Sequence, residues 1–190
     1  MGTGTDDAPT LVGPRVRLRP PTAHDADAFV VAVRASADLH RGWATAPDTP
    51  EAFAAYLARL RTPAVEGFLV VRGEDDALVG RVTLSQIFRG DFQNAYVGYE
   101  AFAGHERRGH LTEGVGLALD HAFGALGLHR VEANVQPGNV PSLALVRRLG
   151  FRREGLSRNY LRVDGLWRDH ERWAILADEH RAGGPDRDAP

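Results

Sequence analysis

The stretch HERRGHLTEGVGLALDHAF (residues 105–123) places two arginines and a glycine directly before a helix with an apolar stripe. Positive charge is unfavourable at that point, because the helix macrodipole already presents partial positive charge at its N-terminus. The amides of the first turn, near residues 109–113, also lack intrahelical partners, so together with the dipole they can hold an anion. We therefore expect a phosphate or pyrophosphate to bind where this helix begins.

Three residues at the start of this helix suit an anion site. Arg107 and Arg108 would contribute charge-assisted hydrogen bonds to a phosphate, and Gly109 would let the backbone approach it where a Cβ atom would obstruct it. The alternative is a solvated surface turn that carries two arginines. The turn alone leaves both interpretations open.

The segments before this helix predict a strand, two helices and three further strands. RVRLRPP (15–21) alternates valine and leucine with arginine and stops at its prolines. A helix over 22–37 follows, and a second helix begins at Pro50; each has an apolar stripe at helical spacing. Strands are expected at 68–72, 77–88 and 95–102, separated by the turn sequences GEDD and RGDFQN.

The segments from the quoted stretch onward predict two more helices in a β-rich region. The long helix spans 111–126, and Gly127 can serve as its left-handed stop. Apolar and polar side chains alternate over residues 129–135, as in a strand with two different faces. PGNVPS begins a short helix over 140–149. Three further strands are expected at 151–153, 157–163 and 167–176, with a hairpin turn at VDGLW. The sum is one α+β domain with a mixed sheet.

The composition is that of one ordinary globular domain, with 190 residues of which 43% are hydrophobic and 25% charged. We place the domain at residues 13–178 and expect disordered tails at 1–12 and 179–190, where Gly, Pro and Asp are frequent. The N-terminus lacks the features of a signal peptide, and no apolar run is long enough to span a bilayer. We therefore expect a cytoplasmic protein with no membrane role.

The residue types exclude several kinds of chemistry. The chain has no cysteine, which excludes disulfides, thiolate zinc sites and a cysteine nucleophile. All 23 basic residues are arginine, so a Schiff-base lysine and a Walker-type phosphate loop are also excluded. The net charge of -2 does not favour nucleic-acid binding as the main activity. The eight histidines show no metal-ligand spacing, so we expect no metal.

Three longer segments carry a family resemblance: RGDFQNAYVGYEAFAGHERRGHLTEG (89–114), LHRVEANVQPGNVPSLALVRRLGFRREG (128–155) and YLRVDGLWRDHERWA (160–174). Their order, spacing and residue types resemble the GNAT superfamily of acetyl-CoA-dependent N-acetyltransferases, and within it the RimJ/RimL-type enzymes that acetylate protein N-termini. The resemblance covers about residues 14–176. It implies the GNAT fold, a mixed and mostly antiparallel sheet flanked by about four helices, and acetyl-CoA as co-substrate.

The resemblance also implies a reaction. An amine would attack the thioester directly, with no covalent enzyme intermediate, which agrees with the absence of cysteine. The implied acceptor is the N-terminal α-amino group of a ribosomal protein. Two alternatives stay open, namely an enzyme that acetylates a small amine or antibiotic and an acyl-CoA-binding sensor without catalysis. The oligomeric state, monomer or homodimer, is also open.

The family's pyrophosphate loop falls on residues 106–111, where Gly109 alone matches the strict pattern and Glu106 stands in place of glutamine or arginine. In this family an asparagine after the fifth strand reaches the pantetheine arm, and Asn139 corresponds to it. Asn139 is also a good helix N-cap, and the two roles are compatible. The residues expected to bind the coenzyme are Ala101, Phe102, Ala103, Arg107, Arg108, Gly109, His110, Leu111, Thr112 and Asn139.

Two residues are candidates for proton transfer. An N-terminal amine has a pKa of about 7.7–8.0, so a base has only one modest proton to remove. Glu100 is the expected base, and the alternative is a solvated carboxylate at a strand end. Ser142 matches the serine that protonates the thiolate in RimL-like enzymes; otherwise it is a polar first-turn residue. Val146 stands where many members have a tyrosine acid, and Asn159 where RimL-like enzymes have a glutamate base.

The acceptor amine is expected to meet three side chains, those of Tyr99, Asn134 and Tyr160. For Tyr160 the alternative is a packed aromatic ring with its hydroxyl at the surface. Polarisation of the thioester carbonyl is expected from backbone N–H groups around residues 99–102, where the central strand splays from its neighbour.

Overall fold

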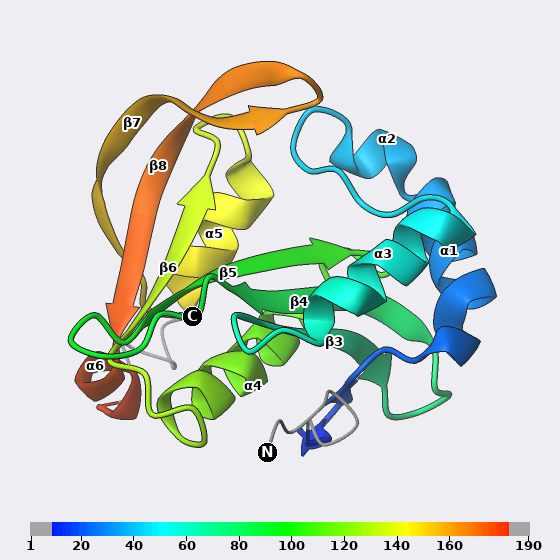
Figure 1. The fold of residues 1–190 in the computed structure, drawn as a ribbon, viewed down its shortest axis with the longest axis horizontal. Coiled ribbons are helices and arrows are strands. Elements are labelled where there is room, and N and C mark those ends of the chain that lie inside the picture. The colour runs from blue at the N-terminus through cyan, green and yellow to red at the C-terminus, as the bar shows by residue number, and fades with distance from the viewer. Residues whose placement is uncertain (1–8, 183–190) are drawn as a thin grey trace.

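One mixed sheet organises the chain in the computed structural model, which describes residues 9–182 (Figure 1). The strands are β1 (Leu11–Val12), β2 (Val16–Arg19), β3 (Val65–Arg72), β4 (Leu78–Ser85), β5 (Asn94–Ala101), β6 (Arg130–Val135), β7 (Arg152–Val163) and β8 (Leu166–Leu176). They form an eight-stranded sheet in the order β1-β2-β3-β4-β5-β6-β8-β7. Only the β5–β6 pair among these strands is parallel. The α+β class and the mostly antiparallel sheet are confirmed.

The helices include the four that the sequence pattern predicts. They are α1 (Ala26–Ala35), α2 (Ala37–His40), α3 (Pro50–Leu60), α4 (His110–Phe123), α5 (Val140–Arg148) and α6 (Ala177–Arg181), with a 3-10 turn, η2 (Ala23–Asp25), before α1. The predicted helix 22–37 is interrupted at Ser36, whose hydroxyl donates to the Ala32 carbonyl (2.6 Å) and accepts from the Ala103 amide (2.9 Å). No helix within residues 9–182 combines the length and apolar character needed to cross a membrane.

Regular structure extends further toward both ends than predicted. Leu11 pairs with Leu18 across β1 and β2 and packs against the main core, although residues 11 and 12 were expected to belong to a tail. At the other end His180, in α6, is buried and its Nε2 lies 2.6 Å from a carboxylate oxygen of Asp120. The rest of the predicted tails, residues 1–8 and 183–190, lies outside the described residues.

Strand β3 shows why helices cover both faces of the sheet. Phe68 and Val70 belong to one buried core, which includes residues of α4, whereas Leu69 and Val71 belong to a second core with residues of α1 and α3. Successive side chains of a strand point to opposite faces, so an unbroken apolar run must be covered on both sides. Accordingly α4 lies on one face and α1 with α3 on the other (Figure 1).

The sheet opens between its two central strands. β5 and β6 are paired over three residues only, from Asn94 opposite Arg130 to Tyr96 opposite Glu132. Beyond this point β5 stays with β4 up to Ala101, and β6 stays with β8, so the two strands diverge (Figure 1). The predicted splay of the central strand is confirmed, and it begins at residue 97.

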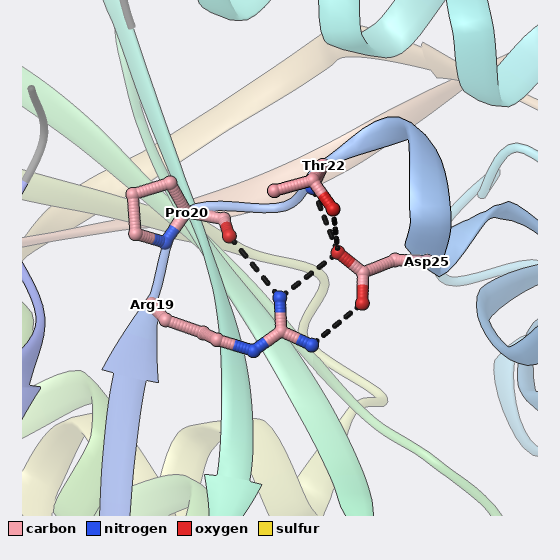
Figure 2. Close-up of polar contacts among 4 residues, drawn as sticks. All are labelled: Arg19, Pro20, Thr22 and Asp25. Carbon is pink, nitrogen blue, oxygen red and sulfur yellow. Dashed lines mark hydrogen bonds and ion pairs between the residues drawn. The ribbon is translucent and has the colours of Figure 1, made fainter. Parts of the chain in front are cut away.

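A network of polar contacts fixes the connection from β2 to α1 (Figure 2). The Arg19 guanidinium donates to both carboxylate oxygens of Asp25 (2.9 and 2.6 Å) and to the Pro20 carbonyl (3.3 Å). The amide and hydroxyl of Thr22 donate to the same carboxylate (2.7 and 3.0 Å). Burial would raise the pKa of Asp25, but the hydrogen bonds from Arg19 and Thr22 outweigh it and lower the pKa below its ordinary value.

We expect Asp25→Asn to lower the free energy of unfolding by roughly 1–2 kcal/mol at pH 7, because Arg19 loses its charged partner in a partly exposed position. The folded-state pKa of Asp25 is depressed, so its contribution is present above about pH 4 and is lost as the pH falls through the folded-state pKa. The deficit of the variant should therefore shrink in acid. Urea denaturation at several pH values measures both effects.

Asp38→Asn is the matched control, because the Asp38–Arg41 ion pair is at the surface and the Asp38 side chain is 91% exposed. Its free energy of unfolding should stay near that of the wild type. Equal losses for the two variants would contradict the role given to Asp25.

Candidate functional site

A cavity of about 1090 Å³ occupies the opening between β5 and β6. Its walls come from α2 and the following loop, α3, β4, β5, β6, the turn before α4 with the first turn of α4, the length of α5, and one residue of β8. Most of the predicted site residues line it: Tyr99, Glu100, Ala101, Arg107, Gly109, Leu111, Thr112, Asn134, Asn139 and Ser142. The structure thus brings together residues that are up to 43 positions apart in the sequence, such as Tyr99 and Ser142.

Five predicted residues do not line this cavity: Phe102, Ala103, Arg108, His110 and Tyr160. The Phe102 side chain is 2% exposed and meets Phe29 edge-on, because it belongs to the core under α1. The Tyr160 ring lies 6.2 Å from the His170 ring. The alternative of a packed aromatic therefore describes Tyr160 better than a cavity position.

The turn before α4 favours glycine at residue 109 for two reasons that were not predicted. Gly109 is the N-cap of α4 with φ of 79°, a left-handed conformation that favours glycine. A Cβ atom there would also lie 3.1 Å from a guanidinium nitrogen of Arg15. Arg15 donates in turn to the Arg108 carbonyl (3.2 Å), so an arginine from the start of β2 lies against the loop.

Glu113 holds this arginine and the strand behind it. The Glu113 carboxylate accepts from the amides of Arg15 (2.7 Å) and Val16 (3.0 Å) and from the Arg15 side chain (2.8 Å). Burial opposes ionisation of Glu113, but these bonds lower its pKa overall. The first turn of α4 is therefore fixed to β2 by contacts that need no bound anion. Neither Arg15 nor this role of Glu113 was predicted, because the two residues lie 98 positions apart.

The electrostatics of this turn favour an anion. The pKa of His105 and that of His110 are both lowered, first by burial and then by nearby arginines: Arg72 and Arg108 for His105, Arg15 and Arg72 for His110. The Nδ1 atoms of both imidazoles are buried without a hydrogen-bond partner among the described residues. Positive charge therefore accumulates here. Neutral histidine is the form that this environment favours.

Glu106, the departure from the family loop, lies on the cavity wall beside Arg107. Arg107 has a left-handed φ of 59°, and Glu106 takes part in none of the ion pairs found within residues 9–182. Arg108 is not among the residues that line the cavity, and its backbone carbonyl accepts a hydrogen bond from Arg15. The two predicted loop arginines therefore have different surroundings.

Glu100 forms a buried ion pair with Arg81 (2.5 Å), and the two side chains are 9% and 12% exposed. The alternative of a solvated strand-end carboxylate is therefore wrong. The Arg81 guanidinium also lies over the Tyr56 ring, 5.4 Å from its centroid. Burial would lower the pKa of Arg81, but the Glu100 charge outweighs it and raises the pKa. Only Oε1 of Glu100 is used in this way; Oε2 takes part in no hydrogen bond within residues 9–182.

The cavity has open space on the Glu100 side of β5. Gly98 lies two residues before Glu100, so both positions face the same side of the strand. A Cβ atom built at Gly98 meets nothing within 4 Å. Thr83, opposite Gly98 on β4, lies 3.3 Å from the Tyr56 hydroxyl and also lines the space. A second substrate has room at this position.

The backbone of β5 presents polar groups to the gap. The Phe102 amide donates to the Val79 carbonyl (2.9 Å), and hydrogen bonding alternates along an antiparallel ladder. The backbone groups of Tyr99 and Ala101 therefore point away from β4, toward the gap. The Ala101 carbonyl confirms this, because it lies 2.7 Å from Nε2 of His40 in α2. His40 is a cavity residue that the sequence pattern did not reveal.

The start of α5 forms the opposite wall. The Asn139 side chain accepts from the Ser142 amide (3.2 Å), so its predicted role as N-cap is confirmed. The Ser142 hydroxyl lies 2.7 Å from the Tyr99 hydroxyl across the gap. Burial raises the pKa of Tyr99 to about 12, although the bond with Ser142 acts in the opposite direction. Val146 is fully buried in the core.

Comparison with known proteins connects this geometry with one family. The sequence model of the family described as "Acetyltransferase (GNAT) domain" matches residues 15–152. The probable N-acetyltransferase YjcK of Bacillus subtilis is 40% identical over 121 residues, which cover 64% of this chain and 67% of that protein. The [Ribosomal protein uS5]-alanine N-acetyltransferase of Escherichia coli is 32% identical over 110 residues, or 58% of this chain and 57% of that one.

A solved structure agrees with the same assignment. Mycobacterium smegmatis RimJ in complex with CoA-disulfide superimposes with a TM-score of 0.83 at 32% identity. The match covers 90% of this chain and 88% of that chain.

Pyrophosphate should raise the pKa of His105 and His110, because an anion at the start of α4 offsets the field of the nearby arginines, Arg15, Arg72 and Arg108. In the free protein we expect both imidazoles to titrate below about 6.5. NMR titration of the histidine ring protons with and without pyrophosphate measures the shift. The exposed His24, at the start of the η2 turn, is the control and should not respond to the anion. Unchanged titration of both His105 and His110 would place the anion elsewhere.

Proposed function

The chain belongs to the GNAT acetyltransferase family, and from that premise we propose that it transfers the acetyl group of acetyl-CoA to the N-terminal α-amino group of a ribosomal or other protein. One observation carries the proposal. A single cavity connects the turn before α4, the polar backbone of β5 in the gap and the open space at Gly98. These three parts correspond to what acetyl transfer needs: a phosphate site, a thioester site and an acceptor site.

The coenzyme would lie across the start of α4 and along the first turn of α5. Its pyrophosphate would take the amides of the first turn near Gly109 and Leu111, with Arg107 beside them. The pantetheine arm would pass Asn139, whose amide nitrogen is free to donate while its oxygen caps α5. The thioester carbonyl would accept a hydrogen bond from a β5 amide in the gap. Backbone donors fixed in this way stabilise developing negative charge.

The acceptor would enter on the Glu100 side. Its amine nitrogen attacks the thioester carbon, the C–N bond forms, and the C–S bond breaks with its electron pair on sulfur. The amine proton leaves through a water toward Glu100 Oε2, the carboxylate oxygen that Arg81 does not use. Ser142, on the opposite wall, would donate a hydrogen bond to the departing sulfur. No enzyme side chain becomes acylated in this sequence.

The nature of the acceptor rests on the names of relatives. The Escherichia coli relative is named for an alanine of ribosomal protein uS5, and the Mycobacterium smegmatis structure is named RimJ. A protein N-terminus is the acceptor that these names support, and the cytoplasm is the proposed place of action. The YjcK relative carries no substrate in its name, so a small amine is the second acceptor to test.

Thiol release measured with acetyl-CoA and a set of N-terminal peptides tests the activity. We expect release to depend on a peptide with a free α-amino group and to stop when that group is blocked. Release with small amines alone would identify a small-molecule enzyme. Binding of acetyl-CoA without release in the presence of any amine would show an acyl-CoA sensor and contradict the proposal.

A large side chain at residue 98 should block the acceptor site and leave the coenzyme site unchanged. Gly98→Leu would fill the open space without meeting another atom near its Cβ, so the fold should persist. We expect turnover to fall at least tenfold while the dissociation constant of coenzyme A, measured by calorimetry, stays unchanged; a tenfold loss corresponds to about 1.4 kcal/mol. Gly98→Ala is the matched control and should lose far less. Weakened coenzyme binding with normal amine kinetics would place the acceptor elsewhere.

Glu100→Gln should lower turnover most at low pH. Below the amine pKa of about 7.7–8.0 the acceptor arrives protonated and needs a base, whereas above it the free amine predominates. The pH profile of kcat/KM measures this, with coenzyme A affinity as the check that the fold survives the loss of the Arg81 partner. A pH profile with unchanged shape would leave Glu100 as the structural partner of Arg81 alone.

A further inference from the structure

We infer that Tyr99 is a positioning residue. Its hydroxyl orients the Ser142 hydroxyl so that Ser142 donates a hydrogen bond to the leaving thiolate. The inference rests on the proposed function and assigns a task within it to a strand residue. Tyr99 is predicted to contact the acceptor, and its hydroxyl lies 2.7 Å from the Ser142 hydroxyl.

The two hydroxyls meet across the open part of the sheet. Tyr99 lies on β5 beyond the last paired residue of the β5–β6 ladder, and Ser142 lies in the first turn of α5. The Asn139 cap accepts from the Ser142 amide and so holds that residue in place. Both residues line the cavity. The contact therefore joins the wall that carries the β5 backbone donors to the opposite wall.

The direction of this hydrogen bond decides what Ser142 can do. Each hydroxyl has one hydrogen to donate and lone pairs to accept. A phenol is the stronger acid of the two, so Tyr99 donates and the Ser142 oxygen accepts. The other acceptor near the phenol, the Ser142 carbonyl, is 3.4 Å away, at the long end for a hydrogen bond. With Tyr99 as donor, the Ser142 hydrogen stays free for a group in the cavity.

No other hydroxyl on α5 reaches the cavity. The further α5 residues on its wall are Val140, Pro141, Ala144, Leu145 and Arg148, none of which has a hydroxyl group. A departing sulfur near α5 therefore has Ser142 as its hydroxyl donor from that helix.

The pair acts by hydrogen bonding and does not need to give up a proton. Burial keeps the Tyr99 phenol protonated, with a pKa of about 12, whereas a free thiol has a pKa of about 8.5. Complete proton transfer from the pair to the thiolate would be uphill. In the step that breaks the C–S bond, the electron pair goes to sulfur, and the Ser142 hydrogen stabilises that charge. Solvent protonates the thiolate after release.

Tyr99→Phe, Ser142→Ala and the double variant test the inference in the thiol-release assay. Each variant keeps its backbone and packing nearly unchanged. We expect Tyr99→Phe to lower kcat by roughly tenfold with KM for acetyl-CoA unchanged, a smaller loss than the 10²–10³ typical of a direct donor. Because Tyr99 acts through Ser142, the double variant should be no slower than Ser142→Ala. This non-additivity is a result that a merely structural role would not produce.

Tyr96→Phe is the matched control. Tyr96 is on the same strand and is not on the cavity wall, so loss of its hydroxyl should leave kcat unchanged. Additive losses in the double variant, an unchanged kcat in Tyr99→Phe, or a loss confined to KM would overturn the inference. Absence of thiol release by the wild type with every amine would overturn the proposed function, and the role of Tyr99 with it. The wild-type activity therefore distinguishes the two failures.

Discussion

Three parallel pairs hold β5 to β6, and the early end of this pairing shapes the whole site. A longer ladder would bring the backbone of residues 97–101 into hydrogen bonds with β6 and close the gap. The divergence leaves the backbone groups of Tyr99 and Ala101 without a strand partner, whereas buried amides and carbonyls in proteins are generally paired. His40 serves one of these groups, the Ala101 carbonyl. The cavity occupies the rest of the gap.

Contacts on either side hold the gap open. On the α5 side, the Tyr99–Ser142 contact spans it, and the Asn139 cap holds Ser142. On the face toward α1 and α3, Arg81 and Glu100 form a buried ion pair, and the Arg81 guanidinium lies over the Tyr56 ring of the second core. At the start of α4, Glu113 and Arg15 fix the turn to β2. The cavity is thus formed by the chain itself before any substrate binds, a condition under which binding needs little reorganisation.

The elements could be predicted from the sequence because each carries a local signal. The apolar stripe of α4, the alternation of β6 and the Asn139 cap depend on neighbours a few residues away. The break at Ser36 could not be predicted, because it depends on the Ala103 amide, two residues beyond the end of β5. Similarly, the ends of the domain depend on tertiary pairing: Leu11 with β2, and His180 with Asp120.

The site could be predicted as a list of residues but not as an arrangement. Glu100 was chosen for its place on the central strand just ahead of the cofactor loop, and Ser142 was found through the resemblance to the family. Their partners Arg81 and Tyr99, in contrast, follow only from strand register and from the gap. Arg81 lies directly opposite Glu100 in the β4–β5 ladder. A correct register for that hairpin would have revealed the pair, since opposite charges on facing positions attract.

The Arg81–Glu100 pair has a consequence for which amines the proposed reaction accepts. The pair is neutral as a whole, so it offers no net attraction to an ammonium ion that must leave water to enter the cavity. Entry and reaction are then easiest for amines that lose their proton readily. At neutral pH an α-amine is uncharged several hundred times more often than a lysine side chain, given pKa values of about 7.7–8.0 and 10.4. A buried charge pair of this kind would favour N-terminal α-amines over lysine side chains because of their protonation state. No contact that distinguishes the shapes of the two groups is needed.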